Sequence, residues 1–236
     1  MDAVVGGGGL IQLPALLLAM PAAAPAQILA TNKLASICGT TTSSITYYRR
    51  VHPDLRTSLP MALWALPGAA VGAAGASLLP TAAFRPLVLV LLVAVAVWTL
   101  LRPDAGSVTR LRFSGRHHHA AAAIIGASLG FYDGIFGPGT GSFLLIALVG
   151  VLGYAFLEAS AHAKIVNLAT NLGALLVFVP QGAPLRGLGL LMGAANVSGA
   201  YLGARTAVAR GSRFVRVVFL LVAFALIVRL GWGLLP

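Results

Sequence analysis

The residues best suited to chemistry in this chain are its two lysines, Lys33 and Lys164, and the polar side chains that follow each of them. Lys164, Asn167 and Asn171 are spaced i, i+3 and i+7, so they share one face of a helix. A lysine in so apolar a stretch is costly and normally faces a cavity or a partner. We expect this face to hold a small anion; the alternative is that each lysine snorkels to lipid headgroups.

Glycine-rich breaks and single acids stand near both lysines in the sequence. The breaks read GGGG after Asp2 and GPGTG after Asp133, with Gly8 and Gly139 at matching places. Each break would expose backbone N–H groups at the start of a short helix, where an anion is stabilised, unless it is a plain turn. The two aspartates could pair with the lysines, carry a proton, or only cap the short helices. No GK[ST] follows either break, which argues against a phosphate-binding loop.

The elements that carry these residues must cross a membrane. The chain is 58% hydrophobic and 9% charged, with a mean hydropathy of +0.93. Several apolar runs are long enough to span the ~30 Å of a bilayer core, and lipid-exposed backbone must be helical or closed in a barrel. The sequence predicts an all-α polytopic membrane protein. The expected segments are Met1–Met20, Pro25–Tyr48, Ser58–Leu79, Leu87–Leu101, Ala120–Leu152 (broken), Leu157–Val179, Leu185–Ala209 and Phe214–Leu235.

The chain also repeats itself at an offset of 131 residues, which superimposes its only two lysines. Ser36 and Thr40 then stand where the second copy has Asn167 and Asn171, so the two half-sites differ. We expect a first repeat over residues 1–101, a basic linker over 102–119 and a second repeat over 120–236. The second copy has an apolar run ahead of its break and the first has none, so we expect the chain to start short of its natural N-terminus.

Arginine placement distinguishes two topologies. If each broken segment crosses the membrane once, the arginines divide 8 against 5 between the two faces. If each broken segment enters and returns on one side, they divide 11 against 2, with only Arg85 and Arg186 on the minority face; in both counts Arg229, which lies within the last helix, is left out. The positive-inside rule favours the second arrangement, in which the repeats are inverted. Inverted repeats with broken helices are typical of secondary transporters.

Other polar residues give no recognisable catalytic set. Glu158 and His162 lie one turn apart, too few for a metal site, and we expect them at the membrane interface. His117–His119 is interpreted as part of a solvated basic linker. Cys38 is the single cysteine, so the chain has no internal disulfide. We expect neither enzymatic activity nor a cofactor.

The motifs DAVVGGGGLIQLPALL, GFYDGIFGPGTG and AHAKIVNLATN resemble those of the sulfite exporter TauE/SafE family. The resemblance covers nearly the whole chain. It implies a multi-pass permease of the plasma (inner) membrane that exports or imports sulfite, a sulfonate or a related organosulfur anion. We expect alternating access between the repeats, with a small anion and membrane lipid as partners and no nucleic acid. A membrane-embedded enzyme and an anion channel remain alternatives.

Overall fold

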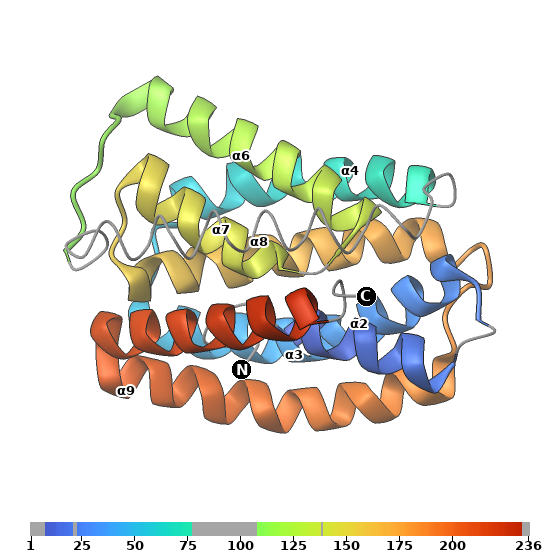
Figure 1. Ribbon diagram of the computed structural model, residues 1–236. Helices are drawn as coiled ribbons and strands as arrows, with labels where there is room; N and C mark the ends of the chain where they lie inside the picture. Colours follow the sequence, from blue (N-terminus) through green and yellow to red (C-terminus); the bar gives the residue numbers. More distant parts are fainter. Residues whose placement is uncertain (1–7, 21–22, 77–107, 138, 233–236) are drawn as a thin grey trace.

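The computed structural model describes residues 8–20, 23–76, 108–137 and 139–232, and within them all regular structure is helical (Figure 1). The expected helix at Leu87–Leu101 and the residue Asp2 lie outside these ranges. The described elements are α2 (Gly8–Ala19), α3 (Pro25–Val51), α4 (Leu55–Gly75), α6 (Gly115–Ile135), α7 (Thr140–Ala147), the π-helical turn η3 (Leu148–Leu152), α8 (Phe156–Phe178) and α9 (Arg186–Trp232).

The predicted break in the segment Ala120–Leu152 is confirmed. Helix α6 ends at Ile135, and α7 begins only at Thr140. Gly139 precedes α7 in the left-handed region, with φ 81°, a conformation that glycine adopts without a Cβ clash. Because the path reverses here, the apolar run forms two helices of unequal length rather than one long span.

This broken segment enters and leaves at the same end of the molecule. The Arg110 N–H donates to the Gly153 carbonyl at 2.8 Å, and the Arg112 N–H donates to the Leu152 carbonyl at 3.1 Å. Residues just before α6 therefore lie against residues just after η3. The segment is a hairpin, which is the arrangement that the arginine split favours.

Helix starts follow the repeat register. Pro25 opens α3 and Phe156 opens α8; Leu55 opens α4 and Arg186 opens α9, so that each pair is 131 residues apart. The two segments expected at Leu185–Ala209 and Phe214–Leu235 are the halves of α9, which turn at Gly211, where φ is 72° and ψ −171°. Glycine provides the positive φ that this turn requires.

Helices α4 and α6 pack through small residues with almost no side-chain volume between them. A Cβ added to a glycine of α6 would overlap a carbonyl oxygen of α4 at three positions: Gly126 against Met61, Gly130 against Ala65 and Gly134 against Ala69. Numbers rise together on both helices, so α4 and α6 run parallel. The pair Gly68 and Gly72 on α4, at GxxxG spacing, meets the α6 backbone in the same way, as its spacing predicts.

Helix α8 also runs parallel to α4. His162, near the start of α8, bonds to Ser58, and Gly173, near its end, packs against the Leu66 carbonyl. Helix α3 runs opposite to α4, since a short turn with His52 at φ 51° joins them. Helix α8 therefore runs opposite to α3, which is its counterpart in the repeat.

The first half of α9 runs beside α3 in the same direction. The Leu185 N–H donates to Thr31 Oγ1 at 3.0 Å, and Asn196 Nδ2 donates to the Ala35 carbonyl at 3.0 Å. The pair α3–α9 thus repeats the parallel pair α8–α4. Each pair joins one helix from the first half of the sequence with one from the second half, so the two halves interlock.

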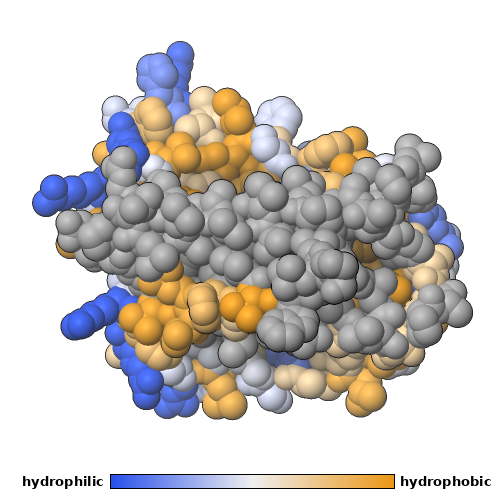
Figure 2. Space-filling model, viewed as in Figure 1, coloured by the Kyte–Doolittle hydropathy of each residue, from blue (hydrophilic) through white to orange (hydrophobic). Residues whose placement is uncertain are grey.

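One end of the molecule is strongly basic. Figure 1 shows the α3–α4 turn, the start of α6 and the bend of α9 together at its left, and Figure 2 shows hydrophilic residues gathered at that end. Large apolar side chains stay exposed between the ends, such as Leu63 at 75% and Leu191 at 71%. Among the described helices, α4 and α8 are long and apolar enough to cross a membrane.

The linker expected over residues 102–119 overlaps a helix. Helix α6 begins at Gly115, so the histidine tract belongs to the first turns of this helix. His118 is buried there, at 5% exposed, whereas His117 and His119 are exposed. Three consecutive histidines show no helical periodicity in the sequence. The pattern therefore does not reveal that one of them, His118, packs against α4.

Candidate functional site

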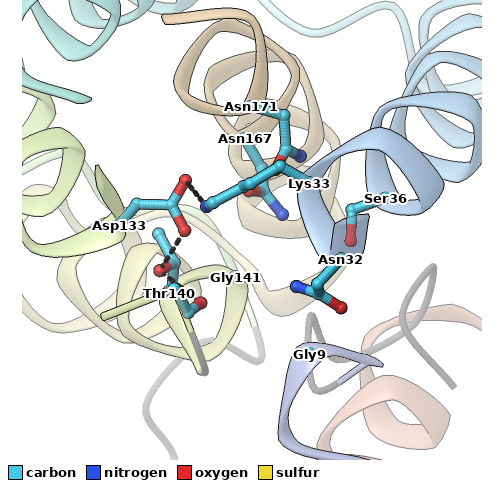
Figure 3. A pocket seen from close by; sticks show the side chains of 10 residues that line it. Gly9, Asn32, Lys33, Ser36, Asp133, Thr140, Gly141, Asn167 and Asn171 are labelled. Carbon is cyan, nitrogen blue, oxygen red and sulfur yellow. Dashed lines mark hydrogen bonds and ion pairs between the residues drawn. The ribbon is translucent and has the colours of Figure 1, made fainter. Parts of the chain in front are cut away.

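A buried ion pair joins the two repeats. Lys33 Nζ on α3 lies 2.5 Å from Asp133 Oδ2 on α6, and both side chains are 2% exposed (Figure 3). Thr140, the first residue of α7, donates its hydroxyl to the other carboxylate oxygen at 2.7 Å. This arrangement excludes snorkelling for Lys33, because its ammonium group is directed at a carboxylate inside the protein.

The pair lies in a small, almost wholly polar pocket of about 20 Å³. That volume has room for about one water molecule and not for a multi-atom oxyanion. Its lining comes from α2, α3, α6, α7, α8 and the break: Gly9, Asn32, Lys33, Ser36, Asp133, Gly137, Thr140, Gly141, Asn167 and Asn171. A polyatomic ion could enter this site only if the site widened.

Half of the residues that the sequence indicated line this pocket. They are Lys33, Ser36, Asp133, Asn167 and Asn171, which come from three different helices. Three others lie outside its lining: Lys164, Thr40 and Gly139. Gly137, Thr140 and Gly141 of the predicted break also line it, as does Asn32, which the sequence did not indicate. Asn32 is 3% exposed, and a polar residue next to a buried lysine was the signal available for it.

Lys164 occupies the α8 position that corresponds to Lys33 on α3, and it is equally buried, at 2% exposed. Thr40 and Asn171 contact each other: Asn171 Nδ2 donates to Thr40 Oγ1 at 3.4 Å. These two positions are 131 residues apart, so they correspond in the repeat. A contact between corresponding positions occurs where the two copies meet.

Both glycine-rich breaks are followed by short helices, as their composition predicts. Helix α2 begins at Gly8 and α7 at Thr140, with Gly139 as the N-cap residue. Thr140 and Gly141 in the first turn of α7 line the pocket. The first amide groups of a helix have no partner within it, so this turn presents positive potential toward the ion pair.

A second buried polar cluster lies near the basic end, and sequence reasoning missed it. His162 Nδ1 lies 2.6 Å from Ser58 Oγ, and His118 Nε2 lies 2.9 Å from Thr57 Oγ1. Tyr154 stands between the two histidines, and its ring centre is 4.4 Å from that of His162. His162, expected at the membrane interface, is buried within the protein, with its side chain 1% exposed. In the part of the chain that the structure describes, no three metal-binding side chains converge.

The geometry combines a fixed cation, a fixed anion and uncharged amide and hydroxyl groups in one buried space. A lysine–carboxylate pair is neutral as a whole, so it can persist in a low-dielectric setting and exchange one partner for a competing ion. The surrounding amides of Asn167 and Asn171 can donate to an oxyanion or accept from a lysine. These are properties of a binding site for a small charged solute.

Comparison with known proteins gives one consistent result. The family model described as "Sulfite exporter TauE/SafE" matches residues 1–230. The chain is 39% identical over 235 residues to a "Probable membrane transporter protein ORF9" of Sinorhizobium sp, covering 98% of this chain and 87% of that one. It is 33% identical over 237 residues to a "Probable membrane transporter protein" of Haemophilus influenzae, covering 98% and 91% of the two chains.

A third relative extends the same pattern. The chain is 32% identical over 223 residues to the "Probable membrane transporter protein YfcA" of Escherichia coli K12, covering 94% of this chain and 81% of the relative. No solved structure shows significant similarity to the chain. Because the family model matches residues 1–230 and the relatives are named as membrane transporters, this chain belongs to the sulfite exporter TauE/SafE family of membrane proteins.

Proposed function

We propose that this protein is a secondary transporter of the plasma (inner) membrane that carries a small anion such as sulfite, a sulfonate or a related organosulfur compound. The observation that carries the proposal is the buried pair of Lys33 and Asp133, which joins the two repeats inside a polar pocket. Transport follows by alternating access, in which the pocket opens first to one side of the membrane and then to the other.

The arrangement of the helices supports inverted repeats. Corresponding helices begin 131 residues apart, α8 runs opposite to α3, and Thr40 bonds to its own counterpart, Asn171. Two copies related by a two-fold axis in the membrane plane can exchange conformations. The exchange converts a state that is open to one side of the membrane into a state that is open to the other side. The membrane is crossed several times, with the basic end toward the cytoplasm.

A charge balance within the pocket suggests how an anion is bound. With the pocket empty of substrate, Lys33 and Asp133 neutralise each other. An incoming anion that takes over the ammonium group leaves the carboxylate without its counter-ion, which favours uptake of one proton by Asp133. Thr140 then keeps its hydrogen bond to the acid. One anion and one proton enter together, and the net charge of the pocket does not change.

Lys164 has a matching role on the second half-site. Its position corresponds to Lys33, and it lies on the same helix as the pocket residues Asn167 and Asn171. We propose that it attracts the anion once the pocket widens, with Asn167 and Asn171 orienting the oxygen atoms. The positive charge matters most in this role, because screening by water is weak there.

The direct test is flux of radiolabelled sulfite into proteoliposomes, with and without a pH gradient. Wild-type protein should concentrate sulfite when a proton gradient favours co-transport. Lys164→Gln keeps length and polarity without the charge and should abolish flux while folded protein is still recovered. Lys164→Arg should retain part of it, because the charge survives in a different shape. Normal flux and affinity in Lys164→Gln would contradict the proposed role.

A further inference from the structure

Asn32 is a polar residue of the pocket around Lys33 for which the ion pair gives no explanation. It lies on α3 directly before Lys33, it lines the pocket, and its side chain is 3% exposed. Successive residues of an α-helix are turned by about 100° from each other, so Asn32 and Lys33 approach the pocket from different sides. Figure 3 shows the amide nitrogen of Asn32 on the side of Thr140 and Gly141, and the amide oxygen turned away from them.

The amide oxygen of Asn32 destabilises the folded protein. It is buried and has no hydrogen-bond partner among the described residues. Such an oxygen has lost its hydrogen bonds to water without replacing them, which is rare in native proteins. The other two asparagines of the pocket are held by neighbours: Thr170 donates to Asn167 Oδ1 at 3.2 Å, and Asn171 Nδ2 donates to Thr40 Oγ1 at 3.4 Å. The stability of the fold therefore does not explain an asparagine at position 32.

Comparison of the two repeats leads to the same conclusion. The pocket lies where the copies meet, because two pairs of corresponding positions line it: Gly9 with Thr140, and Ser36 with Asn167. The position that corresponds to Asn32 is Ala163 on α8, which is buried and lies outside the pocket lining. An apolar side chain fills this position in one copy, so the packing of the helix does not require an amide there.

We propose that Asn32 is an anion-binding residue of this pocket, whose amide nitrogen donates to one oxygen of the bound anion while the Lys33 ammonium binds another. The inference rests on the proposed function, because it concerns the anion of that same site. Two donors that approach from different sides suit an anion whose oxygen atoms point in different directions, as the three oxygens of sulfite and of a sulfonate do. The second repeat has no amide at the corresponding position, so the anion is held closer to α3 than to α8.

The test measures equilibrium binding of radiolabelled sulfite to the full chain, purified in detergent. Asn32→Leu keeps the number of side-chain atoms and removes both the donor and the unpaired oxygen. It should weaken sulfite binding about tenfold, the effect of losing a hydrogen bond to a charged group. The melting temperature without sulfite should equal or exceed that of wild type, because an apolar group has replaced a buried oxygen that had no partner.

Asn196→Leu is the matched control. Asn196 lies on α9 outside the pocket lining, and both ends of its amide are paired. Its Nδ2 donates to the Ala35 carbonyl at 3.0 Å, and its Oδ1 accepts from Gln12 Nε2 at 2.8 Å. The substitution should lower the melting temperature, since two hydrogen bonds are lost, and should change sulfite affinity less than about twofold.

A second variant provides the same comparison with a smaller side chain. Asn32→Ala introduces the residue that the second repeat has at this position. It removes the donor without adding apolar volume to the pocket, and it should also weaken sulfite binding about tenfold.

Three outcomes would overturn the inference. If wild type binds sulfite and both Asn32 variants bind it equally well, Asn32 does not contact the anion, and the proposed function is unaffected. If Asn32→Leu lowers the melting temperature as much as Asn196→Leu does, the role of Asn32 is structural. If wild type shows no saturable binding of sulfite or of methanesulfonate, the proposed substrate class is wrong, and the inference that rests on it is wrong as well.

Discussion

Breaking the pair of Lys33 and Asp133 should destabilise the protein more than removing both charges. Asp133→Asn leaves the Lys33 ammonium buried with no counter-ion, because the amide oxygen that can accept from it carries no net charge. Lys33→Gln leaves the carboxylate with one neutral amide in place of a cation. In the double variant the glutamine carbonyl can accept from the asparagine amide, so neither group stays unpaired.

The magnitude follows from burial. Both side chains are 2% exposed, so water cannot replace a missing partner. Removing one member of a buried pair costs about 3–5 kcal/mol. At about 2–4 °C per kcal/mol for a chain of this size, each single variant should melt roughly 6–20 °C below wild type. The double variant should recover at least half of either loss, because an uncharged pair carries little desolvation cost.

The assay is thermal melting of detergent-purified protein, followed by fluorescence-detected gel filtration, on all four proteins of the cycle. The same four proteins are reconstituted for sulfite flux. We expect flux to be lost in all three variants, including the double variant whose stability recovers. Melting temperatures that fall additively would refute the reasoning, since additivity means that the two side chains do not interact.

Two other predictions concern the fold. In a Cys38→Ser background, a cysteine that replaces the exposed Arg116 should not react with an impermeant thiol reagent added outside sealed cells. A cysteine that replaces Gln181, in the loop at the opposite end, should react. The reverse labelling pattern would contradict the expected topology. Gly134→Ala should lower the melting temperature by several degrees, because its Cβ overlaps the α4 backbone. Gly199→Ala, in open space on α9, should leave the melting temperature almost unchanged. Equal effects of the two substitutions would contradict close packing of α4 with α6.

Much of the fold could be predicted from the sequence because its strongest signals are local or periodic. Glycine-rich breaks identify the starts of α2 and α7, and the offset of 131 residues predicts that Pro25 and Phe156 open corresponding helices. The start of α6 could not be located in the same way. The stretch ahead of it is polar on all sides, and only the packing of His118 against Thr57 shows that the helix has already begun.

The site was predicted in part for a related reason. Spacing places Lys164, Asn167 and Asn171 on one helix face, but the pocket takes only the two asparagines. The partner of Lys33 turned out to be Asp133, from the other repeat, a pairing that the sequence left open among several roles. Which faces meet depends on helix crossing and on the direction of the hairpin, and neither is encoded in the spacing of residues along one helix.

The contact of Thr40 with Asn171 has a consequence for spectroscopy. Positions that correspond in an inverted repeat and touch each other lie on the axis that relates the two copies. If the copies exchange conformations as proposed, the distance between two corresponding positions is the same in both end states, because the exchange maps the pair onto itself. Only distances between positions that do not correspond differ between the two states, so these distances report the conformational change. The distance between spin labels at a corresponding pair near this axis would thus be the same in the two states. It can serve as an internal reference for the distance change of any other labelled pair.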